Sequence, residues 1–223
     1  MALEQVISYF KQLSSIPRQS GDEKAASDFL VKFAQDLGLW VKQDEHYNVI
    51  VKKQGTKGRE EEEAVIIQGH IDMVYVVAEE AEHVYENGIQ VLDDGEFLHA
   101  DGTSLGADNG IAISYAMMLM ADKELSHPPL EFIFTTCEEV GLLGAANLDV
   151  SDLQGKMLMN LDTEVEGSFC SGCAGGMRSA VRIPLERQLE KGDFTRLSVT
   201  LKGLKGGHSG MEIHLERGNA IQL

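Results

Sequence analysis

The chain has 223 residues, of which 43% are hydrophobic and 25% charged, and its formal net charge is −17. This length allows one large domain, or one domain and part of a second, and the composition excludes disordered and membrane-embedded proteins. The negative charge, with no basic patch, argues against binding to nucleic acid or to an anionic membrane. Only three cysteines and an N-terminus without a signal-peptide pattern indicate a cytoplasmic protein that lacks a disulfide framework.

Two amphipathic helices are predicted at the start of the chain. The first has apolar residues at helical spacing and stops at Pro17. The second has its apolar stripe between residues 26 and 37, with Ser20 or Asp22 available as its N-cap and Gly38 closing it.

The strand around which the chain is organised is predicted at residues 64–68, after two other strands at 39–42 and 48–52. It is apolar throughout, as expected of a central strand covered on both faces, and it leads directly to His70 and Asp72. A neutral imidazole is a common zinc ligand, and a nearby carboxylate can fix its tautomer. His70 is therefore a candidate metal ligand with Asp72 as its orienting partner, although such a pair alone is more often an ordinary polar strand end.

Further acidic residues follow apolar segments downstream. One opens a predicted helix, and the others come after predicted strands at residues 130–135 and 156–161. The alternation of strands and helices predicts an α/β layered sheet, in which sites gather at the carboxyl ends of the strands. These acidic residues are Asp108, Glu138, Glu139 and Asp162.

One histidine and several acids nearly meet the needs of two divalent ions, which require a shared carboxylate and one or two further ligands each. Neighbouring side chains at a strand end point in different directions. Of Glu138 and Glu139, one can therefore bind metal while the other takes a proton from water. The set indicates attack of activated water on a polarised carbonyl.

A different domain is predicted to begin at residue 177. Long alternating strands are expected at residues 179–185 and 196–202, followed by a glycine-rich segment that contains His208. The chain then stops within a helical pattern at residues 217–223, which suggests a truncated product. The predicted division is thus residues 1–176 and residues 177–223.

Six motifs in this order resemble those of the aminoacyl-histidine dipeptidases, cytosolic dinuclear zinc exopeptidases also called Xaa-His or non-specific dipeptidases. The motifs extend over most of the chain, and because all six occur in the family's order, the probability of a chance match is very small. They are GHIDMV (69–74), LGADNG (105–110), CEEVG (137–141), NLDTE (160–164), GCAGG (172–176) and GLKGGHSG (203–210).

The resemblance implies a three-layer α/β zinc-exopeptidase-like catalytic domain at residues 1–176 that lacks its C-terminal part. Residues 177–223 would begin a truncated α+β lid domain. The implied activity is metal-dependent hydrolysis of small dipeptides, Xaa-His and broader. The complete protein would use two zinc ions, with cobalt or manganese as the alternatives.

The resemblance also implies a role for each matched residue. His70 and Asp162 would bind one zinc, Glu139 the other, and Asp108 would bridge them. Asp72 would orient His70, and Glu138 would be the general acid/base. His208 would help to bind substrate or to stabilise the tetrahedral intermediate, and the peptide bond after Asp108 is commonly cis in the family.

The family's last zinc-binding histidine has no counterpart here, since His214 does not match it. We therefore expect this polypeptide alone to be weakly active or inactive. Two alternatives stay open: an amino-acid N-deacylase or deacetylase with the same metal cage, or a noncatalytic fragment. The preferred dipeptide and the formation of a homodimer also stay open.

Overall fold

The structure is a computed structural model that describes residues 2–163, 165–172, 179–186, 192–206, 212–220 and 222–223. The chain separates into two compact units, Met1–Gly167 and Ser168–Leu223, and each is described by itself. The division predicted between residues 176 and 177 stays a prediction.

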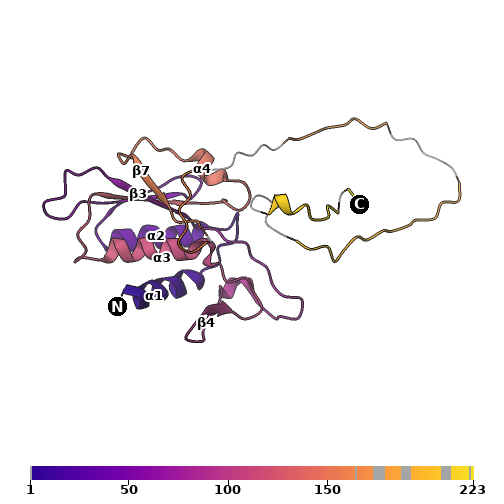
Figure 1. The fold of residues 1–223 in the computed structure, drawn as a ribbon, viewed down its shortest axis with the longest axis horizontal. Coiled ribbons are helices and arrows are strands. Elements are labelled where there is room, and N and C mark those ends of the chain that lie inside the picture. Colours follow the sequence, from indigo (N-terminus) through magenta and orange to yellow (C-terminus); the bar gives the residue numbers. More distant parts are fainter. Residues whose placement is uncertain (1, 164, 173–178, 187–191, 207–211, 221) are drawn as a thin grey trace. The chain divides into compact units, whose positions relative to one another are not determined.

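A five-stranded mixed sheet forms the centre of the first unit (Figure 1). Its order is β1-β2-β6-β3-β7. β3 runs parallel to both β6 and β7, whereas β2 runs antiparallel to β1 and β6. The predicted central strand is confirmed, and the α/β class with it. The strands are β1 (Trp40–Gln43), β2 (Val49–Lys53), β3 (Val65–His70), β6 (Leu130–Thr135) and β7 (Met157–Asn160).

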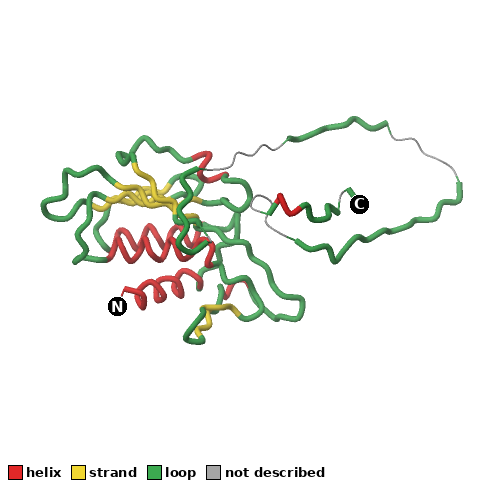
Figure 2. The backbone as a smooth tube through the Cα atoms, viewed as in Figure 1, coloured by secondary structure: helices red, strands yellow, loops and turns green. Residues whose placement is uncertain are grey.

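Three long helices pack together on one face of the sheet, and the short α4 lies on the other side (Figures 1 and 2). α2 contacts β1 and β2, α3 contacts β3, and α1 packs on α3. Their apolar stripes meet the strands in one core that includes Leu30, Ile113 and Phe132. No helix within the described ranges combines the length and apolarity needed to cross a membrane. The helices are α1 (Ala2–Ser14), α2 (Lys24–Asp36), α3 (Ala107–Ala121) and α4 (Leu143–Asn147).

β3 is buried on both faces, as its apolar sequence predicts. Successive side chains of a strand point to opposite faces, and both Ile66 and Ile67 are buried. Its neighbour β7 is exposed along its whole length. The sheet is therefore well covered around β3 and β6 and open at β7.

The start of the second helix differs from the prediction. α2 begins at Lys24 with Glu23 as its N-cap, so neither Ser20 nor Asp22 caps it. Both residues lie too far before the first helical turn. The Ser20 hydroxyl instead donates to a carboxylate oxygen of Asp72, 2.7 Å away.

A long excursion separates β3 from α3. It contains the 3₁₀ turn η1 (Tyr85–Asn87) and an antiparallel hairpin of β4 (Val91–Asp93) and β5 (Leu98–Ala100). The amide of Gln19 donates to the Tyr85 hydroxyl at 3.0 Å, which ties the excursion to the segment between α1 and α2.

The second unit corrects the prediction of two long strands. The described residues 179–186 and 192–206 form no strand, and their alternating apolar side chains are exposed, at 80% for Val181 and 93% for Val199. An alternating pattern becomes a strand only where another strand accepts its hydrogen bonds and a second layer buries its apolar face. Within the described part of this unit neither is present, and η2 (Ile213–Leu215) is its regular element.

A buried carboxylate on β6 fixes the approach to β7. Glu131 accepts the backbone N–H of Gln154 at 2.9 Å and of Gly155 at 2.8 Å, and it lies 3.1 Å from Nζ of Lys52. Burial raises the pKa of Glu131, but these hydrogen bonds and the lysine outweigh it and hold the pKa below its ordinary value. Glu131 thus anchors the loop that leads into β7.

We expect Glu131→Gln to lower the free energy of unfolding near pH 7 by about 1–3 kcal/mol, because the amide presents a donor to backbone N–H groups. A folded-state pKa below 4.5 means that the carboxylate stabilises the fold above that pH and loses its effect as the pH falls. Urea unfolding near pH 7 and pH 4 should therefore show a smaller acid-induced loss in the variant. The exposed Glu61→Gln is the control, and equal stability of the two variants would contradict the anchoring role.

Candidate metal centre

The sheet topology brings the predicted site residues to one edge. Since β3, β6 and β7 are parallel, their carboxyl ends lie on the same side of the sheet. His70 is the last residue of β3, Glu138 and Glu139 follow β6, and Asp162 follows β7. Asp108 lies in the first turn of α3. The parallel arrangement therefore explains why positions distant in sequence meet.

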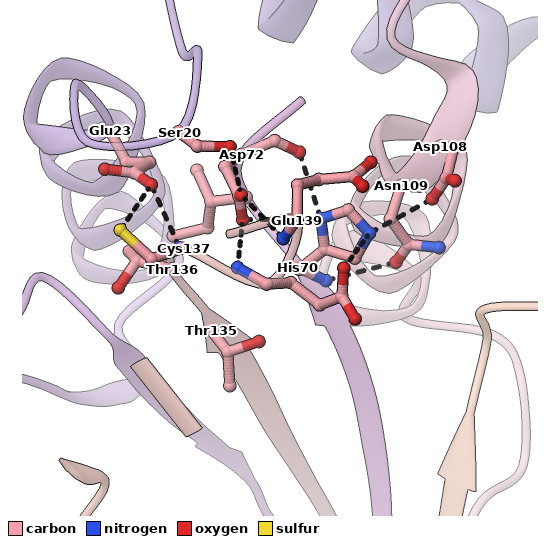
Figure 3. A network of polar contacts seen from close by, with 12 residues as sticks. Ser20, Glu23, His70, Asp72, Asp108, Asn109, Thr135, Thr136, Cys137 and Glu139 are labelled. Atoms are coloured by element: carbon pink, nitrogen blue, oxygen red, sulfur yellow. Dashed lines mark hydrogen bonds and ion pairs between the residues drawn. The ribbon is translucent and has the colours of Figure 1, made fainter. Parts of the chain in front are cut away.

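His70 lies at the centre of the cluster (Figure 3). Its imidazole is 1% exposed, and its Nε2 is 3.0 Å from Oδ1 of Asp108. The same nitrogen lies 3.8 Å from Oδ1 of Asp162 and 4.0 Å from Oε2 of Glu138. Nε2 of His70 therefore faces three carboxylates.

The other ring nitrogen faces Asp72. Nδ1 of His70 lies 3.0 Å from the backbone oxygen of Asp72 and 3.4 Å from its carboxylate Oδ1. Asp72 is completely buried, so its charge is stabilised by protein groups rather than by water. The contact supports the predicted orienting role and leaves Nε2 directed toward the acids.

Asp72 also holds the backbone of the two glutamates, which the sequence did not indicate. Its Oδ1 accepts the N–H of Glu138 at 3.0 Å, and its Oδ2 accepts the N–H of Glu139 at 3.3 Å. Together with the Ser20 hydroxyl, these donors saturate the carboxylate. Asp72 therefore fixes the position of the glutamates as well as that of His70.

Asn109 is a second connecting residue that sequence reasoning missed. Its Oδ1 accepts the N–H of His70 at 3.1 Å, and its Nδ2 donates to the backbone oxygen of Leu161 at 2.8 Å and to Asp162 at 3.2 Å. The bond between Asp108 and Asn109 is cis, as the resemblance implied. The position of Asn109 directly after Asp108 was the one feature of the sequence that could have indicated its role.

Arg18 was missed for want of any signal, because it lies alone between two predicted helices. The side chain is 1% exposed. Nη1 donates to the backbone oxygen of Ile71 at 2.8 Å and Nη2 to that of Gly106 at 2.5 Å. Burial lowers the pKa of Arg18 to about 10, against the charges of Asp72 and Asp108. The guanidinium thus links the end of β3 to the start of α3.

The acids perturb one another's protonation. Burial lowers the pKa of His70, but hydrogen bonds to Asp108 and Asp72 outweigh it and raise the pKa to about 10. Burial raises the pKa of Asp162 to about 6; the charge of His70 opposes the shift, and the carboxylates of Asp108 and Glu138 add to it. Burial and Asp108 also raise the pKa of Glu139. The imidazole is consequently protonated at neutral pH, when no metal is bound.

Two sets of three donors can each hold a metal ion, with all ligand atoms of a set within 4.8 Å of one another. One set is His70, Asp108 and Asp162, and the other is His70, Glu138 and Glu139. Imidazole nitrogen and carboxylate oxygen suit zinc, cobalt and manganese, so the donor chemistry fits a divalent cation. His208, the predicted substrate-binding residue, lies outside the described residues.

Several known proteins with similar sequences or structures are named as peptidases. Residues 48–168 match the family model described as "Peptidase family M28". The chain is 40% identical over 215 residues to the cytosol non-specific dipeptidase of Escherichia coli. It also resembles the crystal structure of the aminoacylhistidine dipeptidase of Vibrio alginolyticus, with a TM-score of 0.72 and 34% identity. The aminopeptidase PepT of Bacillus cereus has a TM-score of 0.60 and 27% identity.

The similarity to the two dipeptidases runs along nearly the whole of this chain but along less than half of theirs. It covers 96% of the chain and 44% of the Escherichia coli protein, and 97% of the chain and 44% of the Vibrio alginolyticus chain. For PepT the shares are 72% and 43%.

In the metal-free chain, we expect stability to fall by about 2 kcal/mol as the pH rises from about 6.5 to about 8.5. The pKa of His70 is raised from 6.5 to about 10, so the protonated imidazole stabilises the fold fully below pH 6.5 and loses its effect as the pH rises toward 10. Urea unfolding with a chelator present measures the slope.

His70→Gln should flatten this slope because it removes the titrating group. The exposed His99→Gln should keep it. A His70→Gln chain with an unchanged slope would assign the pH dependence to other groups.

Proposed function

This chain belongs to peptidase family M28, and on that premise we propose that it carries part of the metal site of a dipeptidase. The observation that supports the proposal best is the convergence of one imidazole and the carboxylates of Asp108, Glu138 and Asp162 within 4.0 Å of its Nε2. The names of the two relatives that match nearly the whole chain support dipeptides as substrates. Because the chain spans 44% of their length, the activity is proposed for the whole protein.

The proposed metal is zinc, in two ions, with cobalt or manganese as the alternatives. His70 and Asp162 would hold one ion and Glu139 the other, with Asp108 between them. The Nδ1 contacts of His70 with Asp72 support this arrangement, because they direct Nε2 toward the carboxylates that would share the metal. The surplus of carboxylates around one imidazole supports it as well, since a cation offsets their mutual repulsion.

When bound, such ions supply Lewis acidity and promote the ionisation of water next to a peptide carbonyl. Glu138 would take the proton from that water at its carboxylate and pass it to the leaving amine. Two features suit it to the role: its side chain is 28% exposed, and its backbone N–H is held by Asp72. Asp72 would keep His70 and both glutamates in place throughout the reaction.

His208 is proposed to bind substrate, on the strength of the motif resemblance alone. The cytoplasm is proposed as the location, which the name of the Escherichia coli relative supports. Residues 1–176 and 177–223 are proposed as the catalytic and lid portions. The N-deacylase alternative uses the same metal chemistry, but the two relatives that match nearly the whole chain are named as dipeptidases.

Zinc binding near pH 7 should release about one proton, because coordination needs a neutral imidazole and the pKa of His70 is about 10 without metal. Calorimetric titration in two buffers of different ionisation enthalpy measures the release. The affinity should rise with pH. Asp108→Ala should weaken zinc binding and His70→Ala should also abolish the proton release, whereas the exposed His99→Gln should change neither. Tight binding to the His70→Ala chain would contradict the assignment.

In the protein that contains this chain, Glu138→Gln should lower kcat for an Xaa-His dipeptide by about 10²–10⁴-fold, because the amide cannot accept a proton. Bound zinc, measured by elemental analysis, should stay the same if Glu138 acts as base rather than as ligand. The exposed Glu61→Gln is the control. Faster turnover of an N-acetyl amino acid than of the dipeptide would favour the deacylase alternative.

A further inference from the structure

The backbone that carries the two glutamates is held by side chains. β6 ends at Thr135, and each of the next four backbone N–H groups donates to a side-chain oxygen. Elements far apart in the sequence supply these oxygens. Figure 3 shows the contact between Glu23 and Cys137. The bonds are Thr136 N to Asn48 Oδ1 at 3.1 Å, Cys137 N to Glu23 Oε1 at 3.0 Å, Glu138 N to Asp72 Oδ1 at 3.0 Å and Glu139 N to Asp72 Oδ2 at 3.3 Å.

Glu23 is the carboxylate of this network that has no part in the proposed chemistry. It is buried, at 3% exposure, just before the first turn of α2. Its Oε1 accepts the N–H of Gly21 at 3.0 Å, the N–H of Cys137 at 3.0 Å and the thiol of Cys137 at 3.3 Å. A buried carboxylate needs such donors, since it has lost its water.

Capping of α2 does not account for this side chain. Glu23 occupies the N-cap position, but its carboxylate makes no capping hydrogen bond to the helix. Its hydrogen bonds go instead to the loop before the helix and, across 114 positions of sequence, to Cys137. The side chain therefore serves the segment after β6 rather than its own helix.

Cys137 is the residue at which the chain turns toward the cluster. Its φ is +50°, in the left-handed region that non-glycine residues seldom adopt. Glu138 and Glu139 come next, so the orientation of the Cys137 peptide sets the positions of the two Cα atoms that carry these carboxylates. A strong acceptor on the Cys137 N–H stabilises this turn.

We infer that Glu23 is a positioning residue for the Glu138 and Glu139 pair, acting through the backbone of Cys137. Asp72 holds the N–H groups of Glu138 and Glu139 themselves and contacts His70 directly. Glu23 instead holds the N–H of Cys137, the residue before the pair. The consequence for metal affinity rests on the proposed function, because it requires that Glu139 and its neighbours bind a cation. The consequence for the local backbone does not.

The test compares Glu23→Ala with Glu23→Gln by titration with Zn²⁺ alone, against a competing chromophoric chelator. Loss of a residue that supports metal ligands typically costs about 10–100-fold in affinity, and we expect a loss of this size for Glu23→Ala. Glu23→Gln keeps an acceptor oxygen and should lose less than about tenfold. Hydrogen exchange of the amides of residues 137–139 should be fastest in Glu23→Ala.

Glu131→Ala is the matched control. Glu131 is equally buried, at 3% exposure, and also accepts two backbone N–H groups, but it lies away from the cluster. The Glu131→Ala substitution should lower the free energy of unfolding and leave the zinc affinity unchanged. The hydrogen exchange of residues 137–139, relative to the global unfolding rate, should also stay the same. Equal zinc affinity in Glu23→Ala and the unaltered chain, or an equal loss in Glu131→Ala, would overturn the inference.

A chain that binds no Zn²⁺ before any substitution would refute the proposed metal site instead. The positioning inference would then be decided by hydrogen exchange alone. Faster exchange of the Cys137 and Glu138 amides in Glu23→Ala than in Glu131→Ala would support it, and equal exchange would overturn it.

Discussion

The burial of one negative charge, on Asp72, is the constraint on which the rest of the site depends. A carboxylate without water is stable only where protein donors surround it, and Asp72 obtains them from Ser20, from His70 and from the amides of Glu138 and Glu139. These donors come from three different parts of the chain. Satisfying the charge therefore requires that β3, the segment after β6 and the loop before α2 meet at one point, and the candidate metal ligands meet there with them.

The balance of charges in this region explains both the protonation of His70 and the proposed binding of a cation. The described residues buried around the cluster include two cationic side chains, Arg18 and His70. Of the acids near them, Asp72 is buried, whereas Asp108, Glu138 and Asp162 are partly exposed. The imidazole gains a proton because the neighbouring carboxylates stabilise its positive charge. A divalent cation would displace that proton and take over its electrostatic role. Protonation of His70 and the proposed metal binding are thus two responses to one excess of negative charge.

Several interpretations of the sequence agree with the structure because they rest on short-range patterns. The apolar run ending at His70 reads as a strand buried on both faces, and β3 is such a strand. The expected cap of α2 was wrong, because local preference cannot tell Ser20 in a cap from Ser20 bonded to Asp72, 52 residues away. The strands expected at residues 179–185 and 196–202 were also wrong. Their alternation describes a surface that needs a partner, and the described part of that unit holds none.

By itself, the sequence determined the α/β class, the order of the strands along the chain and the identity of His70, Asp108, Glu138, Glu139 and Asp162 as candidates, because residue chemistry and periodicity are local properties. Only the tertiary structure decided that these side chains share one edge of the sheet and that Arg18, Glu23 and Asn109 support them. These three act through hydrogen bonds to backbone groups far away in sequence. Such bonds depend on the pairing of parallel strands and on the burial of charge, neither of which any short stretch of residues encodes.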